Sequence, residues 1–377
     1  MIALANHLPR VRVPWVPLGD WPTPLTALPL DGQPVWVKHE GDAHPRYGGN
    51  KLRTLELWFG HAQARGARRI WAIGAYGSNH TIATVLHAPR AGLEAAAIVF
   101  PQPASEAASE NCGALIATGC PLIRLRSVVE VPFVGWRVAR RERDAVVMPP
   151  GGATPVGTLG AVAAAFELAD QIAAHQAPPP RRIVLAVGST CTAAGLVAGL
   201  ALAQAVGVWR WPVPIVHGVR VTPWPVTSRL RTAALARRTL ARIEQLGGPR
   251  VAIGLPELVR RLVIDGQELG PGYGRSTPRA EAAMREIHDA GGRGPEATST
   301  PAAQPGERRS PAASLPPSRL DSVYSGKAAA ALLRLHRAGL GPLVFWASKS
   351  TATLAPPSPA ALDAAPAALA RWLRGAT

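Results

Sequence analysis

Short apolar runs alternate with alanine-rich runs along most of the chain, and this rhythm restricts the fold more than any other feature of the sequence. Runs of the first kind are typical of buried strands, and runs of the second kind are typical of helices. Three such pairs are RRIWAIGA then NHTIATVLHAPRAG, AAAIVF then SEAASENCGALIATG, and RRIVLAVGS then TAAGLVAGLALAQAV. Repeated strand–turn–helix units predict an α/β protein whose sheets are open, mostly parallel and twisted, with helices on both faces. A chain of 377 residues favours two such domains.

Two segments depart from this rhythm. Residues 291–319 are rich in Pro, Ala, Ser and Gly and show no hydrophobic period, so we expect a disordered insertion there. The tail from Leu354 to Thr377 is typical of a linker followed by a short amphipathic helix.

Charge and cysteine content argue against several classes of protein. The net charge is +17, but the arginines are spread along the chain and no nucleic-acid-binding motif accompanies them, so we expect no nucleic-acid partner. The first residues lack the order of a signal peptide, and the apolar stretches are too short to cross a bilayer. The three cysteines form no CxxC pair, which predicts free thiols. We therefore expect a cytoplasmic protein without a membrane span or a metal site.

The chain has only four lysines that could supply a catalytic amine, and Lys51 has the most distinctive setting. It follows the glycine turn Gly48-Gly49-Asn50 at the predicted start of a helix. The positive field at a helix N-terminus favours the neutral, nucleophilic form of an amine. A solvent-exposed lysine after a glycine turn explains the same residues, so this segment alone leaves both interpretations open.

Two further turns carry polar residues between a predicted strand and a predicted helix. Ser78, Asn79 and His80 form the first, where backbone amides and short side chains converge on an anion. Ordinary N-capping by Ser78 or Asn79 is the simpler alternative, but three consecutive polar residues beside glycines favour a binding site. The second turn is a predicted phosphate cradle of amides and hydroxyls, formed by Gly188, Ser189, Thr190, Cys191 and Thr192.

Taken in order, these segments resemble the pyridoxal-phosphate (PLP) dependent family of D-cysteine desulfhydrase and 1-aminocyclopropane-1-carboxylate (ACC) deaminase, which has the tryptophan-synthase β-like fold. We assign residues 1–53 and 160–377 to a large PLP-binding domain and residues 54–159 to a small domain. The motifs that carry the resemblance are GDWPTPL, GGNKLRTLE, GAYGSNH, PPGGATPVGTLGAVAAAFEL, GSTCTAAGL, GPGYG, LDSVYSGKAAA and FWASKS.

The resemblance implies a role for each site residue. Lys51 matches the Schiff-base lysine that also moves protons at the substrate α-carbon, and Asn79 matches the residue that bonds the 3′-oxygen of PLP. Ser78 and His80 would hold the substrate carboxylate or lie beside it. The turn Gly188–Thr192 matches the phosphate loop, although Thr190 and Cys191 replace two of its usual glycines. Helix-start amides can still bind phosphate there, provided that the backbone avoids positive φ.

The remaining matches concern the reaction. Tyr273 and Tyr324 match positions that face the substrate, where phenols act as general acid–base or nucleophile, and with Ser78 and Lys51 they complete the predicted catalytic group. Ser325 stands where ACC deaminases have a glutamate, and Ser348 matches a partner of the cofactor's ring nitrogen. Hydroxyl partners support a less charged ring, which is adequate for losing a good leaving group from the β-carbon.

We therefore expect α,β-elimination from a small, D-cysteine-like amino acid, with release of pyruvate and ammonia. ACC deamination and a catalytically degenerate PLP-binding homologue are the alternatives. The family commonly forms dimers, so a homodimer is a further expectation.

Overall fold

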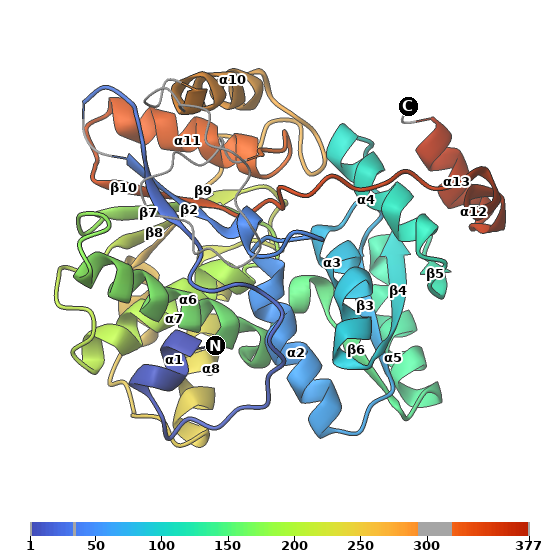
Figure 1. Ribbon diagram of the computed structural model, residues 1–377, viewed down its shortest axis with the longest axis horizontal. Coiled ribbons are helices and arrows are strands. Elements are labelled where there is room, and N and C mark those ends of the chain that lie inside the picture. Colours follow the sequence, from blue (N-terminus) through green and yellow to red (C-terminus); the bar gives the residue numbers. More distant parts are fainter. Residues whose placement is uncertain (1, 33–34, 293–318, 376–377) are drawn as a thin grey trace, which may run out of the picture.

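The computed structural model describes residues 2–32, 35–292 and 319–375, and it contains two sheets placed side by side (Figure 1). In the larger sheet the strand order is β1-β2-β10-β7-β8-β9, and all neighbours are parallel except the antiparallel pair β1 and β2. Its strands are β1 (Leu25–Leu28), β2 (Val35–His39), β10 (Leu343–Ala347), β7 (Arg182–Val187), β8 (Ile215–Arg220) and β9 (Leu262–Asp265). The last strand of the chain, β10, lies between β2 and β7.

The smaller sheet is entirely parallel, with the order β5-β4-β3-β6. Its strands are β3 (Arg69–Ala75), β4 (Glu94–Phe100), β5 (Leu122–Arg124) and β6 (Ala145–Met148). Side chains of β3 alternate between two cores, as the two-residue period of a strand requires. Ile70 and Ala72 enter one buried cluster, whereas Trp71 and Ile73 enter another. Both faces of this sheet are therefore covered.

Helices cover the larger sheet on both faces as well. One face packs against α6 and α7 and the other against α10 and α11. The helices are α1 (Ile2–His7), α2 (Lys51–Ala64), α3 (Asn79–His87), α4 (Glu106–Ala117), α5 (Val131–Arg141), α6 (Pro155–Ala173), α7 (Cys191–Ala205), α8 (Arg229–Gln245), α9 (Leu255–Arg260), α10 (Pro278–Gly292), α11 (Ser325–Arg337), α12 (Pro359–Ala364) and α13 (Ala367–Arg374). Short 3₁₀ segments are η1 (Glu40–Asp42), η2 (Ala88–Ala91), η3 (Val128–Glu130) and η4 (Pro150–Gly152).

The predicted α/β class with mostly parallel sheets is confirmed. The tail forms two short helices, α12 and α13, where the sequence predicts one. Both helices contact α4 beside the smaller sheet (Figure 1). The division at residues 53/54 and 159/160 stays a prediction, and nearly all of the predicted insertion 291–319 lies outside the described residues.

One helix differs from the expectation that every apolar stretch is too short for a bilayer. Within the described residues, α6 alone is long and apolar enough to pass that test. However, 83% of its apolar window is buried inside the fold, where α6 packs between α2 and α7. A central core helix meets the same length criterion, so α6 is explained by its position in the core.

Candidate active site

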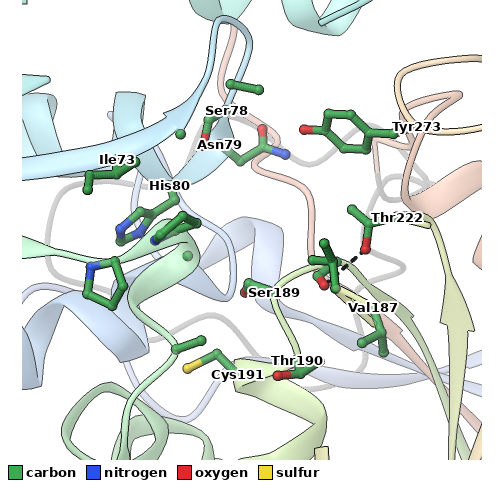
Figure 2. Close-up of a pocket in the computed structure, with 18 of the residues that line it drawn as sticks. Ile73, Ser78, Asn79, His80, Val187, Ser189, Thr190, Cys191, Thr222 and Tyr273 are labelled. Atoms are coloured by element: carbon green, nitrogen blue, oxygen red, sulfur yellow. Dashed lines mark hydrogen bonds between the residues drawn. The ribbon is translucent and has the colours of Figure 1, made fainter. Parts of the chain in front are cut away.

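A cavity of about 770 Å³ lies where the carboxyl ends of strands from both sheets meet. Its walls include the end of β3, the end of β7, the residues after β10 and the start of α2. In open α/β sheets, ligands bind at this edge because strand-to-helix turns present backbone amides and short polar side chains there. Figure 2 shows Ser78, Asn79 and His80 on one side of the cavity and Ser189, Thr190 and Cys191 on another.

Lys51 is the first residue of α2 and lines this cavity. No hydrogen bond or ion pair of its Nζ is found among the described residues. Burial lowers its pKa, although the nearby Cys191 opposes the shift. The pKa is therefore lowered, in the predicted direction, because the amine is withdrawn from water. The Nζ of Lys38 and that of Lys327 are hydrogen-bonded to acceptors outside the cavity.

The loop before Lys51 is held by residues near the end of the chain. The amide of Asn50 donates to the carbonyl of Ser348 at 3.3 Å, and the amide of Gly48 donates to the Ser350 hydroxyl at 2.9 Å. Gly49 has a φ of +97°, and a Cβ there would lie 2.8 Å from the carbonyl oxygen of Ser348. A side chain at this position would therefore push the Lys51 loop away from β10.

Asn79 is oriented by three donors that converge on its side-chain oxygen. The hydroxyl of Tyr47 donates to Oδ1 at 2.7 Å, Nδ2 of Asn111 at 2.8 Å and Nζ of Lys349 at 3.4 Å. Because Oδ1 is occupied by donors, the amide must present its Nδ2 to the cavity, as drawn in Figure 2. Asn79 is thus a hydrogen-bond donor toward an acceptor oxygen, which suits the predicted contact with the 3′-oxygen of PLP.

Ser78 and His80 flank Asn79 and also line the cavity. Ser78 is the N-cap of α3, and its hydroxyl accepts from the amide of Thr81 at 3.3 Å, so the simpler alternative of capping is realised as well. His80 is 2% exposed, and neither ring nitrogen has a hydrogen-bond partner. Burial and the nearby Lys51 lower the pKa of His80 to about 3, so the ring is neutral at pH 7.

The turn Gly188–Thr192 joins β7 to α7, and all five residues line the cavity. Amides in the first turn of α7 have no acceptor within the helix, which makes them donors for an anion. Thr192 accepts a hydrogen bond from Nδ2 of Asn50 at 2.8 Å, so the turn is tied to the residue beside Lys51. The thiol of Cys191 is buried near the hydroxyls of Thr54 and Thr158, so its amide is the group available to a ligand.

The condition set for this turn, a backbone without positive φ, is not met. Thr190 has φ 72° and ψ −10°, the left-handed conformation that glycine adopts without strain. The backbone therefore keeps a glycine-type shape although a β-branched residue stands there. Strained residues of this kind persist where the surrounding fold holds them, often at binding sites.

Tyr273 and Tyr324 meet across the cavity, with their hydroxyl oxygens 2.8 Å apart. Burial raises the pKa of both phenols, so both are protonated near neutral pH. One phenol can therefore donate to the other and pass a proton toward a group in the cavity. The sequence alone gives no reason for this pairing, because the two residues are far apart in the chain.

Of the two predicted serine partners, only Ser348 lines the cavity. The hydroxyl of Ser325 lies 2.9 Å from Oδ2 of Asp321, and its side chain is 2% exposed and lies outside the cavity wall. Ser325 therefore serves to position the Asp321 carboxylate at the start of α11. The predicted contact of Ser325 with the cofactor finds no support in this geometry.

Sequence reasoning missed four residues of the site, namely Tyr47, Asn111, Asp321 and Lys349. Tyr47 and Asn111 act on the cavity through Asn79, and Asp321 lies within the motif LDSVYSGKAAA but received no role from it. Lys349 lines the cavity with a side chain that is nine-tenths or more buried. The sequence sign that Lys349 belongs to the site is its position directly after Ser348.

These groups fit PLP by their chemistry. A phosphate needs the free amides of the Gly188–Thr192 turn, a phenolic oxygen needs the donor of Asn79, and an aldehyde needs the unpaired amine of Lys51. Among the described residues that line the cavity, Asp321 is the single carboxylate against several basic side chains, which suits an anionic ligand. No group of three His, Cys, Asp or Glu residues in the described chain could hold a metal ion.

Comparison with known sequences adds three findings. The model of the family described as pyridoxal-phosphate dependent enzyme matches residues 16–316. The chain is 39% identical to the nocardicin C-9′ epimerase of Nocardia uniformis subsp. tsuyamanensis over 50% of this chain and 60% of the relative. It is 31% identical to the D-cysteine desulfhydrase of Salmonella paratyphi C over 52% of this chain and 62% of the relative.

A solved structure described as an ACC deaminase homologue matches nearly the whole fold. It covers 93% of this chain and 94% of its own, with a TM-score of 0.69 and 26% identity. By contrast, the chain spans about three fifths of the length of the two named sequence relatives.

Proposed function

The chain belongs to the pyridoxal-phosphate dependent enzymes, and from that premise we propose that it removes the α-proton of an amino acid and eliminates the substituent on the β-carbon. The products would be the free leaving group, pyruvate and ammonia. The bond from Cα to hydrogen and the bond from Cβ to the leaving group break, the leaving group takes a proton, and one water releases the keto acid.

One observation carries this proposal. The amine of Lys51 faces the cavity without a hydrogen-bond or ion-pair partner in the described structure, and its pKa is lowered by burial. A lowered pKa makes it easier for this amine to release a proton and take it back, and no described side chain holds the amine in an ion pair. The donors of Asn79 and the amides of the Gly188–Thr192 turn share the same cavity and would hold the cofactor against it.

The other residues are given supporting roles. The cofactor, when bound, supplies an electron sink for the charge left on the α-carbon. Ser78 and the neutral His80 would bind the substrate carboxylate. The Tyr273–Tyr324 pair would protonate the leaving group, because both phenols hold their protons at neutral pH and one can relay to the other.

Two serines, one in the cavity wall and one just outside it, favour elimination over ACC deamination. Ser348 lines the cavity, and the position after Tyr324 holds a serine whose hydroxyl is bonded to Asp321. A carboxylate from that position, which would support a more demanding ring opening, is lacking. The relative named D-cysteine desulfhydrase agrees with this choice.

Epimerisation at the α-carbon is the second candidate, favoured by the 39% identity to the nocardicin C-9′ epimerase. It shares the first step with elimination, because both begin with removal of the α-proton. The reactions differ in whether the β-substituent leaves or a proton returns to the α-carbon from the other side.

The test is a panel of D- and L-amino acids given to the cofactor-loaded protein in deuterated water. Pyruvate from D-cysteine or β-chloro-D-alanine is the expected result. Deuterium at the α-carbon with inversion and no keto acid would favour epimerisation, and 2-oxobutyrate from ACC with no pyruvate from D-cysteine would favour the deaminase. A colourless protein that takes up no PLP would contradict every one of these functions.

We also propose a cytoplasmic location and a homodimer. The three free cysteines agree with a reducing compartment, and the homodimer rests on the family alone.

A further inference from the structure

The cavity extends well beyond the residues assigned to the cofactor and to a small substrate. Its outer chamber is the part lined by Arg126, Val128, Pro132, Pro223, Val226 and Arg231. Val128 belongs to η3, Pro132 lies at the start of α5, and Arg126 lies two residues before η3. The last three come from the loop after β8 and the start of α8. The two sides of the outer chamber therefore belong to the smaller and the larger sheet.

Exposed large apolar side chains are concentrated in the two chain segments that supply the walls of this chamber. Seven of the eight large apolar side chains that are exposed lie in residues 128–136 and 224–230. Among them, Val128 is 55% exposed and Val226 is 42% exposed, and both line the cavity. Scattered exposed apolar residues need no explanation, but a cluster at the mouth of a binding cavity indicates a ligand surface.

The chamber also carries two arginines without acidic partners. Neither the guanidinium of Arg126 nor that of Arg231 forms an ion pair in the described part of the chain. The nearby carboxylate of Glu130 is used on backbone amides, since its Oε1 accepts from the amides of Arg126 and Ser127 at 3.0 and 2.9 Å. An acidic ligand group would therefore find two cations that no side chain of the described residues neutralises.

From these features we propose that the outer chamber binds the side chain of the substrate, and that this side chain is bulky, apolar over most of its length and acidic at its far end. The chamber is continuous with the space around Lys51, so a ligand that fills it also reaches the reacting amine. A protein partner bound to the same residues would block the entrance to the cavity, so a substrate side chain is the better occupant. This inference rests on the proposed function, because it names the substrate class of the same site.

The test compares three probes on the cofactor-loaded protein, namely cysteine, S-phenylcysteine and S-(4-carboxyphenyl)cysteine, each as both enantiomers. Half-saturation is read from the change in visible absorbance, and turnover from release of pyruvate and of the thiol. The phenyl group should improve affinity roughly tenfold or more over cysteine through apolar burial. The carboxylate should add roughly a further three- to fivefold, as an exposed ion pair does.

Variants separate the two contributions. Arg126→Gln and Arg231→Gln should reduce the preference for the carboxylated probe over the plain phenyl probe, whereas Val226→Asp should weaken both aryl probes. Arg137→Gln is the matched control, because Arg137 is an exposed arginine of α5 outside the cavity wall. Equal affinity for cysteine and the aryl probes would overturn the inference, as would an unchanged preference in both arginine variants. If no probe alters the absorbance or releases a keto acid, the proposed function fails together with it.

Discussion

Lys38 and Lys51 lie on either side of η1, yet the structure treats their amines in opposite ways. Lys38 is fully buried on β2, and its Nζ lies 2.5 Å from Oε1 of Glu167, 2.8 Å from Oε1 of Gln171 and 2.7 Å from the carbonyl of Thr23. Arg53 completes this network by binding Glu40 and Glu167. Burial alone would raise the pKa of Glu167, but Arg53 and Lys38 outweigh it and hold the pKa at about 2.

Lys51, by contrast, has no such partner among the described residues and faces a cavity. A buried ion pair that loses one member leaves an uncompensated charge, so every member of the Lys38 network is needed for stability. An amine without partners contributes little to stability and is free for chemistry. The contrast teaches that the number of partners, rather than burial alone, distinguishes the structural lysine from the reactive one.

The strongest test of this comparison is Lys51→Ala. We expect keto-acid release to fall roughly 10³-fold or more, because the variant lacks the amine that holds the cofactor and moves the proton. The free energy of unfolding of the cofactor-free protein should stay within about 1 kcal/mol of the parent, as measured by urea denaturation.

Lys349→Met is the matched control for this variant, because Lys349 lines the same cavity. It should keep a visible absorbance band that borohydride bleaches, whereas Lys51→Ala should lack it. If Lys349→Met loses the absorbance band and Lys51→Ala keeps it, then Lys349, and not Lys51, holds the cofactor.

Lys38→Met should show the reverse pattern. It leaves Glu167 buried with Arg53 as its one cation, and we expect a loss of about 3–5 kcal/mol in the free energy of unfolding. The molecules that do fold should still bind PLP, and each should show the same visible absorbance as the parent protein. Gln171→Met removes a neutral partner of the same amine and should cost about 1–2 kcal/mol. A stable Lys38→Met protein without absorbance would refute the comparison.

A pH series extends the comparison to His80, a second cavity residue without partners. Its pKa is lowered from 6.5 to about 3, so below pH 6.5 the unfolded chain takes up a proton that the folded chain refuses. The stability due to this group is complete above pH 6.5 and falls as the pH drops toward 3. At pH 5 the loss is about 2 kcal/mol, which His80→Asn should remove.

This difference is measured on the cofactor-free protein by denaturation of both proteins at pH 7 and pH 5. The other titrating groups are the same in the parent protein and in His80→Asn, so their contributions to the pH dependence of stability cancel. Equal losses in the two proteins would show that His80 takes up its proton in the folded state.

The smallest expected effect concerns Thr190. Glycine normally destabilises a folded chain relative to alanine, but at a left-handed residue the order reverses. Thr190→Gly should therefore be more stable than Thr190→Ala by about 1 kcal/mol, with phosphate binding by the turn retained. Thermal unfolding with and without PLP measures both quantities. A more stable alanine variant would show that this turn has relaxed out of the left-handed region.

Much of the fold follows from local patterns. The alternation of Ile70 and Ala72 with Trp71 and Ile73 is visible in the sequence as an uninterrupted apolar run, which is typical of a strand covered on both faces. The turns at Ser78–His80 and Gly188–Thr192 are equally local, because each follows a strand and opens a helix. Their position in one cavity does not follow from either turn alone, because β3 and β7 belong to different sheets whose carboxyl ends meet only in the folded protein.

What could not be predicted depends on contacts between distant segments. Asn79 is oriented by Tyr47, Asn111 and Lys349, three residues that no short motif connects. The positive φ of Thr190 goes against the preference of a β-branched residue, and the sequence gives no sign of it. Ser325 was assigned to the cofactor from its place beside Tyr324, yet helix geometry directs its hydroxyl to Asp321. The orientation of Asn79 depends on tertiary packing, whereas Ser325 is held by a residue only four positions away.

The hydrogen bonds from Gly48 and Asn50 to Ser350 and Ser348 have a consequence for biosynthesis. The loop before Lys51 emerges early from the ribosome, but its two anchors are made near the end of translation. At about 5–20 residues per second, roughly 15–60 seconds separate the two segments. A nascent chain therefore cannot complete this loop during most of its synthesis, and PLP would be acquired only after the last strand has joined the sheet.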